Sequence, residues 1–161
     1  MTYSPAAIAN YFLSKASQEG RTLTPMQLIK LVYIAHGWHL GYFDRPLISE
    51  RVQAWKFGPV IDSLYHCLKQ YGNGAITSFI PIPLQSSTMI SDANSIALLD
   101  HVWRSYSSYN GMQLSTMTHQ PNTPWSRVWE ASGRFNRSEE IPEEEIKAHY
   151  KQKIADAARV N

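Results

Sequence analysis

The sequence has few of the residues that would place it in several common classes of protein. It contains one cysteine in 161 residues, Cys67, which excludes an intrachain disulfide. Charged residues make up 17% of the chain, below the roughly 25% of an average domain, and the net charge is +2. Lysine and arginine are scattered, whereas nucleic-acid-binding proteins usually cluster them in a patch. No segment approaches the roughly 20 apolar residues of a membrane span. We therefore expect neither a membrane nor nucleic acid as a partner.

The beginning of the sequence and its length add two expectations. The first residues, MTYSPAAIANYFL, lack the basic start and the long apolar stretch of a signal peptide. Together with the single cysteine, this predicts a cytoplasmic protein. A chain of 161 residues suits one domain, so we expect residues 1–161 to form a single unit.

Aromatic residues are abundant where charges are scarce. They make up 12% of the chain, with five tryptophans and nine tyrosines. Tyr and Trp combine a large apolar body with one polar tip, which suits both protein cores and protein interfaces. The composition therefore favours a binding surface and, equally, a core built from rings.

The apolar periodicity predicts a mainly α fold. We expect a compact bundle of about six helices around a central buried helix, about residues 24–41, with a short strand or hairpin near residues 46–57. Thr24, Pro25 and Gln27 give the central helix a capping box and a proline in its first turn. After the Gly58-Pro59 break, a third helix is expected to begin at Pro59.

One pair of histidines could serve catalysis. His36 and His39 lie three residues apart on the central helix, as zinc ligands can. The H-E-x-x-H spacing of metalloproteases is absent, and two histidines on such a helix are more often hydrogen-bonded packing residues. The adjacent His66 and Cys67 do not face each other on a helix, so they do not form a nucleophile pair. We expect no metal, no cofactor and no catalytic residues.

Two junctions between loops and helices are candidates for a binding surface. The first is AWKFGPV, residues 54–60, which contains Trp55, Lys56 and Phe57; the second is THQPNTPW, which ends at Trp125. Binding residues are often carried on loops held by a rigid scaffold. We expect Trp55 to brace the turn and Lys56 and Phe57 to contact a partner, with Trp125 as a further partner-binding candidate.

The sequence resembles the Panacea domain family, the SocA-like antitoxins, also called phage-associated GepA-like proteins. The resemblance rests on LTPMQLIKLVYIAHGWHLGYFDRPLISERVQAWKFGPVIDSLY, on the later THQPNTPW, and on a final helix with the pattern I-x-x-x-x-I-x-x-x-Y. The motif residues that we expect to hold the fold are Thr24, Lys30, Tyr33, Gly37, Gly58 and Pro59.

The resemblance implies an antitoxin that is not an enzyme. Members of the family neutralise a toxin, encoded by an adjacent gene, through direct protein contact, and some relatives deliver the toxin to a protease. The expected partners are therefore a cognate toxin and a protease. Two alternatives from the residues stay open: a metal-dependent hydrolase that uses His36 and His39, and a nucleic-acid-binding regulator.

The first prediction concerns Gly58. A glycine before proline at this break suggests a backbone conformation that β-branched residues tolerate poorly. We expect Gly58→Val to lower the melting temperature, measured by circular dichroism. An unchanged melting temperature would show that Gly58 has no special backbone role.

Overall fold

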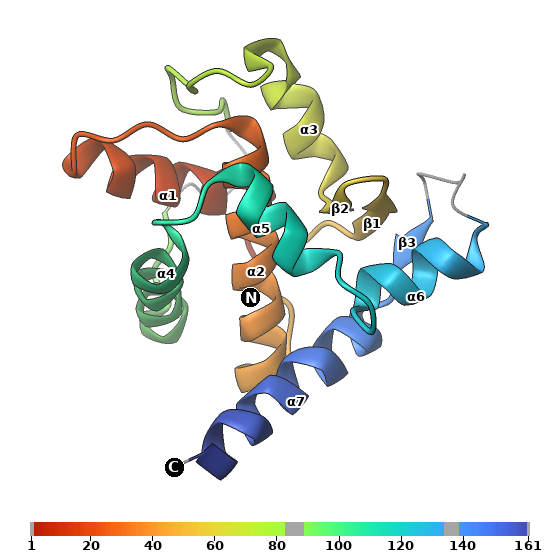
Figure 1. The fold of residues 1–161 in the computed structure, drawn as a ribbon. Coiled ribbons are helices and arrows are strands. Elements are labelled where there is room, and N and C mark those ends of the chain that lie inside the picture. Colours follow the sequence, from red (N-terminus) through yellow and green to blue (C-terminus); the bar gives the residue numbers. More distant parts are fainter. Residues whose placement is uncertain (1, 83–88, 134–138, 161) are drawn as a thin grey trace.

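Helices dominate the part of the chain that the computed structural model describes, residues 2–82, 89–133 and 139–160 (Figure 1). In chain order the elements are α1 (Pro5–Gln18), α2 (Pro25–Phe43), β1 (Val52–Trp55), β2 (Gly58–Val60), α3 (Asp62–Leu68), the 3₁₀ helix η1 (Lys69–Tyr71), α4 (Ala93–Tyr106), α5 (Gly111–Thr118), α6 (Pro124–Ala131), β3 (Glu140–Ile141) and α7 (Glu143–Val160). The expected mainly α fold with a minor strand component is confirmed.

Helix α2 is the central element, as the sequence predicts. It contacts α1, α4, α5 and α7, which are placed around it in Figure 1. Both hydrogen bonds of the predicted capping box are present, because Thr24 accepts from the Gln27 backbone and Gln27 accepts from the Thr24 backbone. The helix runs to Phe43, past the expected end at residue 41. Asp44 ends it with a left-handed φ of 58°.

Helix α7 packs closely along α2 because α2 carries glycines where the two helices meet. A Cβ on Gly37 would lie 2.1 Å from Cε2 of Tyr150, and a Cβ on Gly41 would lie 3.0 Å from Cβ of Tyr150. Tyr150 is buried, and its ring meets the rings of Tyr33 and Trp38 edge to face. The motif glycine Gly37 is thus explained by the close approach of the final helix.

The strands differ from the prediction. The hairpin spans residues 52–60, later than the expected 46–57, and α3 begins at Asp62 instead of Pro59. The sheet has the strand order β2-β1-β3, so β2 is an edge strand. Pro59 is tolerated there because no further strand needs its missing N–H as a hydrogen-bond donor. Strand β3 was not predicted, since two residues are too few to show an alternating pattern.

Three other helices begin directly after a capping residue. The side chains of Ser4, Asp92 and Thr123 accept hydrogen bonds from backbone N–H groups in the first turns of α1, α4 and α6. The proline-containing segment ITSFIPIPL, residues 76–84, predicts an extended arm or an edge strand; its described residues, 76–82, form no strand, and residues 83–84 lie outside the described part. Among the helices that the structure describes, none combines the length and the apolar character needed to cross a bilayer.

The contact between α2 and α7 predicts the effect of Gly37→Ala. Helix propensity alone favours alanine by about 1 kcal/mol. The added methyl group would overlap the Tyr150 ring, and overpacking typically costs about 1–3 kcal/mol. We therefore expect net destabilisation in urea unfolding. The penalty should shrink in a Tyr150→Leu background, and an equal penalty in both backgrounds would show that the ring is not the cause.

Candidate functional site

The β1–β2 hairpin is held by side chains from three helices. The backbone carbonyls of alternate residues accept these bonds. The indole of Trp125 on α6 donates to the carbonyl of Trp55, and Ser115 on α5 donates to the carbonyl of Phe57 over 2.6 Å. Lys30 on α2 donates to the carbonyl of Pro59 over 2.9 Å. These three hydrogen bonds therefore hold the hairpin, with the turn between its strands, against α2, α5 and α6.

Lys30 is a buried cation at the foot of this hairpin. Its side chain is 2% exposed, and burial lowers the pKa of its ammonium group to about 7. Gly58 has a φ of 115°, and a Cβ at this position would lie 2.7 Å from Nζ of Lys30. Lys30 is far in the sequence from the adjacent Gly58 and Pro59 but contacts them here, so these motif residues describe one contact.

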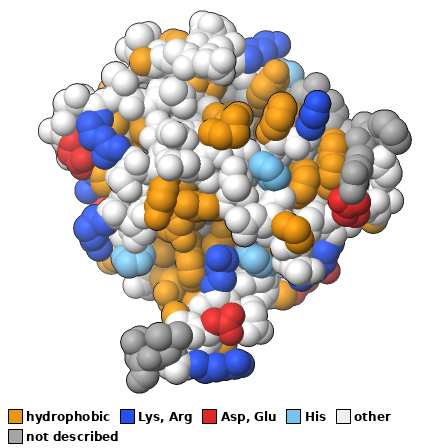
Figure 2. All heavy atoms as spheres, viewed as in Figure 1, with side chains coloured by type: hydrophobic (Ala, Val, Ile, Leu, Met, Phe, Trp, Pro, Cys, Tyr) orange, Lys and Arg blue, Asp and Glu red, His pale blue; other side chains and the backbone are white. Residues whose placement is uncertain are grey.

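The two residues at the tip of the hairpin face outward. Phe57 is 54% exposed, and Lys56, also exposed, places Nζ 5.5 Å from the centre of the Phe57 ring. Figure 2 shows hydrophobic side chains on the surface over α3 and the hairpin, with basic side chains close by. Trp55 lies beneath, 9% exposed, with its ring edge to face with that of Tyr65 at 4.7 Å.

A groove of about 590 Å³ opens beside the hairpin. We call it the hairpin groove. Most of its lining is apolar and comes from α2, the hairpin, α3, the turn after η1, and α6. The lining residues are Pro25, Met26, Ile29, Lys30, Trp55, Lys56, Phe57, Val60, Tyr65, Lys69, Gly72, Asn73 and Trp129.

The charges of the hairpin groove are all of one sign. Lys30, Lys56 and Lys69 line it, and among the described residues no aspartate or glutamate does. Within the described residues, Lys56 and Lys69 form no ion pair. Such a groove suits an apolar side chain that is flanked by carboxylates.

The structure brings three of the four predicted partner-binding residues to the hairpin groove. Trp55, Lys56 and Phe57 line it, whereas Trp125 lies behind it, 7% exposed. The ring of Trp125 stacks on that of Trp129 at 5.6 Å, and the half-buried Trp129 forms part of the wall. Sequence reasoning missed Trp129. Its position four residues after Trp125 on α6, on the same helix face, was the available signal.

The two histidines of α2 are buried and hydrogen-bonded. Nδ1 of His36 accepts from the backbone N–H of Leu47 over 3.3 Å. The ring of His39 lies 2.7 Å from the carbonyl of Arg45 and 3.3 Å from the hydroxyl of Ser95. Burial lowers the pKa of His36 to about 4. No group of three or more His, Cys, Asp or Glu within the described residues is placed to hold a metal ion.

Comparison with known proteins shows the family to which the chain belongs. The chain is a member of the SocA-like antitoxin family: the family model described as "Antitoxin SocA-like, Panacea domain" matches residues 28–126, which include Lys30 and the hairpin. The chain is also similar to Antitoxin SocA of Caulobacter vibrioides (strain NA1000 / CB15N). The two are 30% identical over 135 residues, which cover 79% of this chain and 71% of the relative. No solved structure matches the chain.

The buried lysine predicts a pH dependence of stability. In the folded protein the pKa of Lys30 is about 7, below its value of about 10.4 in an unfolded chain. The unfolded state therefore binds more protons between these two values, so Lys30 makes the free energy of unfolding rise as pH increases above 7. We expect Lys30→Met to lose this rise, measured by urea unfolding at pH 7, 8 and 9.

Lys69 provides the matched control for this measurement. It lines the same groove but is exposed. Lys69→Met should keep the wild-type pH dependence. If Lys30→Met also keeps it, the ammonium group of Lys30 does not titrate in this range in the folded protein.

Proposed function

We propose that this protein is an antitoxin that neutralises a toxin by direct protein contact, without catalysis of its own. Membership of the SocA-like antitoxin family and the name of the relative support the antitoxin role. The observation that carries the mode of action is the hairpin groove, an apolar surface with cations only, beside an outward-facing Phe57.

The hairpin groove has the properties of a protein-binding surface. Interfaces concentrate binding energy in a few aromatic and basic residues that sit in well-packed pockets. Phe57 is exposed while its backbone is held by Ser115, so little conformational freedom of the turn remains to be lost on binding. Trp55 and Trp129 provide further ring surface in the same groove.

The chemistry of the hairpin groove also defines the partner segment. Lys56 and Lys69 stand at its exposed edge, and Lys30 lies at its buried base. A segment with an apolar side chain would fill the groove, and flanking carboxylates would meet the lysines. We propose that the toxin presents such an acidic and apolar segment. A carboxylate next to Lys30 would also favour the charged form of its ammonium group.

Neutralisation by occlusion and neutralisation by delivery to a protease differ in one observable. Occlusion leaves the amount of toxin in the cell unchanged, whereas delivery lowers it. We propose occlusion through the hairpin groove, and immunoblotting of the toxin with and without this protein tests the choice. A fall in toxin level that requires a protease gene would identify delivery instead.

The test of the proposed function is co-expression with the product of the adjacent gene. The neighbour should arrest growth alone, this protein should restore growth, and the two should copurify. Phe57→Ala should weaken their binding by about 2 kcal/mol, because truncated interface anchors typically cost this much. Lys56→Glu should weaken it further by repelling the acidic segment. Binding can be measured by calorimetry on the purified pair.

Two variants elsewhere on the surface serve as controls. Phe79 is 57% exposed and lies outside the groove lining, so Phe79→Ala should bind as the wild type does. Arg104 is exposed on α4, so Arg104→Glu controls for the change of charge. If folded Phe57→Ala and Trp129→Ala both neutralised the toxin fully, the proposal that the hairpin groove binds the toxin would be wrong. A harmless neighbour that never copurifies would contradict the antitoxin role.

A further inference from the structure

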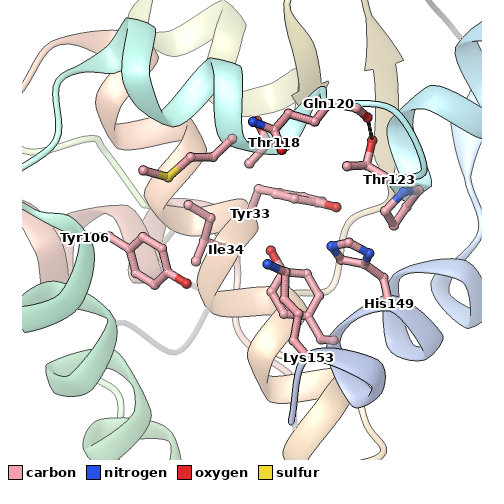
Figure 3. Close-up of a pocket in the computed structure, with 11 residues that line it drawn as sticks. Tyr33, Ile34, Tyr106, Thr118, Gln120, Thr123, His149 and Lys153 are labelled. Atoms are coloured by element: carbon pink, nitrogen blue, oxygen red, sulfur yellow. Dashed lines mark hydrogen bonds between the residues drawn. The ribbon is translucent and has the colours of Figure 1, made fainter. Parts of the chain in front are cut away.

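A second pocket lies between the central helix and the final helix, apart from the hairpin groove. Its volume is about 230 Å³, below the roughly 300–1,000 Å³ of sites for drug-sized ligands, so it suits a small molecule. Figure 3 shows the ring of Tyr33 lying across this pocket, Tyr106 entering from α4, and His149 and Lys153 reaching in from α7. We call it the tyrosine pocket.

Two phenol hydroxyls of the tyrosine pocket have no hydrogen-bond partner among the described residues. Tyr33 and Tyr150 are 2% and 4% exposed, and neither hydroxyl forms a hydrogen bond within the described residues. Every fully buried side-chain nitrogen or oxygen of the described residues has a partner. Each of the two hydroxyls therefore keeps some exposed surface, and both tyrosines line the pocket. Burial raises the pKa of both groups, which keeps them protonated as donors.

A third phenol adds a further donor. The hydroxyl oxygen of Tyr106 accepts a hydrogen bond from the indole of Trp38 over 3.1 Å, which leaves its own proton available to the pocket. Of the residues that the structure describes, Lys153 lines the tyrosine pocket and no aspartate or glutamate does. Lys153 forms no ion pair within the described part of the chain.

The electrostatic environment of His149 shows which charge the tyrosine pocket favours. Its pKa is lowered to about 4, first by burial and then by the positive charges of Lys153 and Arg127. Arg127 on α6 is paired with Glu145, and apart from Lys153 and His149 itself the described polar side chains of the pocket lining, phenols, hydroxyls and one amide, are uncharged. Burial disfavours a charge of either sign, but the positive charges of Lys153 and Arg127 would attract an anion beside His149.

We propose that the tyrosine pocket binds a small free oxyanion, with a carboxylate or a phosphate as its charged group. Phenol donors form short, strong hydrogen bonds to anionic oxygen, and Tyr33, Tyr150 and Tyr106 all present such donors. Lys153 supplies the opposite charge at the exposed side, and an anion beside His149 would raise the pKa of its imidazole. This site is independent of the toxin and of the hairpin groove.

The test is a nuclear magnetic resonance titration of the His149 imidazole, assigned from the signal lost in His149→Asn. The probes are inorganic phosphate, acetate and, as a neutral match to acetate, acetamide. We expect a saturable shift with an anion and none with acetamide, and a bound anion should raise the pKa of His149 above about 4. Tyr33→Phe keeps the buried ring and removes only the hydroxyl, so it should weaken anion binding about tenfold.

The titration distinguishes the two classes of anion. Stronger binding of phosphate assigns the phosphate class, and stronger binding of acetate assigns the carboxylate class. Tyr71→Phe is the control, because its hydroxyl meets Ser78 outside the pocket. The proposal fails if neither anion gives a saturable shift, if acetamide matches acetate, or if folded Tyr33→Phe binds as the wild type does.

Discussion

The hydrogen bond from the buried ammonium of Lys30 to the carbonyl of Pro59 is the interaction on which the site depends. An ammonium group loses its hydration when it is buried, so the fold retains it at a cost. The bond holds β2 against α2. It also places Nζ of Lys30 within 2.7 Å of the position that a Cβ on residue 58 would take. The turn is then held on the far side by Ser115, so Phe57 must face outward.

The same central helix organises a second contact on its other side. Gly37 lets Tyr150 of α7 approach the α2 backbone, and this approach places Tyr150 beside Tyr33. The family motif therefore records two physical contacts, one between α2 and the hairpin and one between α2 and α7. Each contact borders a cavity: the hairpin groove next to Lys30, and the tyrosine pocket next to Tyr33.

The sequence predicted best where local chemistry decides the structure. Thr24 and Gln27 set the start of α2, and Pro25 fits its first turn, so the central helix was predictable from a short segment. Pro59 was misassigned to a helix because its strand depends on its partner Ala54 across the hairpin and on the distant Lys30 of α2. The site was predictable in part for the same reason: the tip residues carry a local signal, whereas Trp129 joins them only through the tertiary fold.

The central claim is that the hairpin groove is the surface that binds the toxin. Hydrogen–deuterium exchange of the protein alone and in its copurified complex tests this claim most directly, because it locates the interface without any substitution. The account predicts protection of the hairpin tip at Lys56 and Phe57 and of the exposed turn at Gly72 and Asn73, which border the groove. Protection confined to other segments, with these residues exchanging as in the free protein, would contradict it.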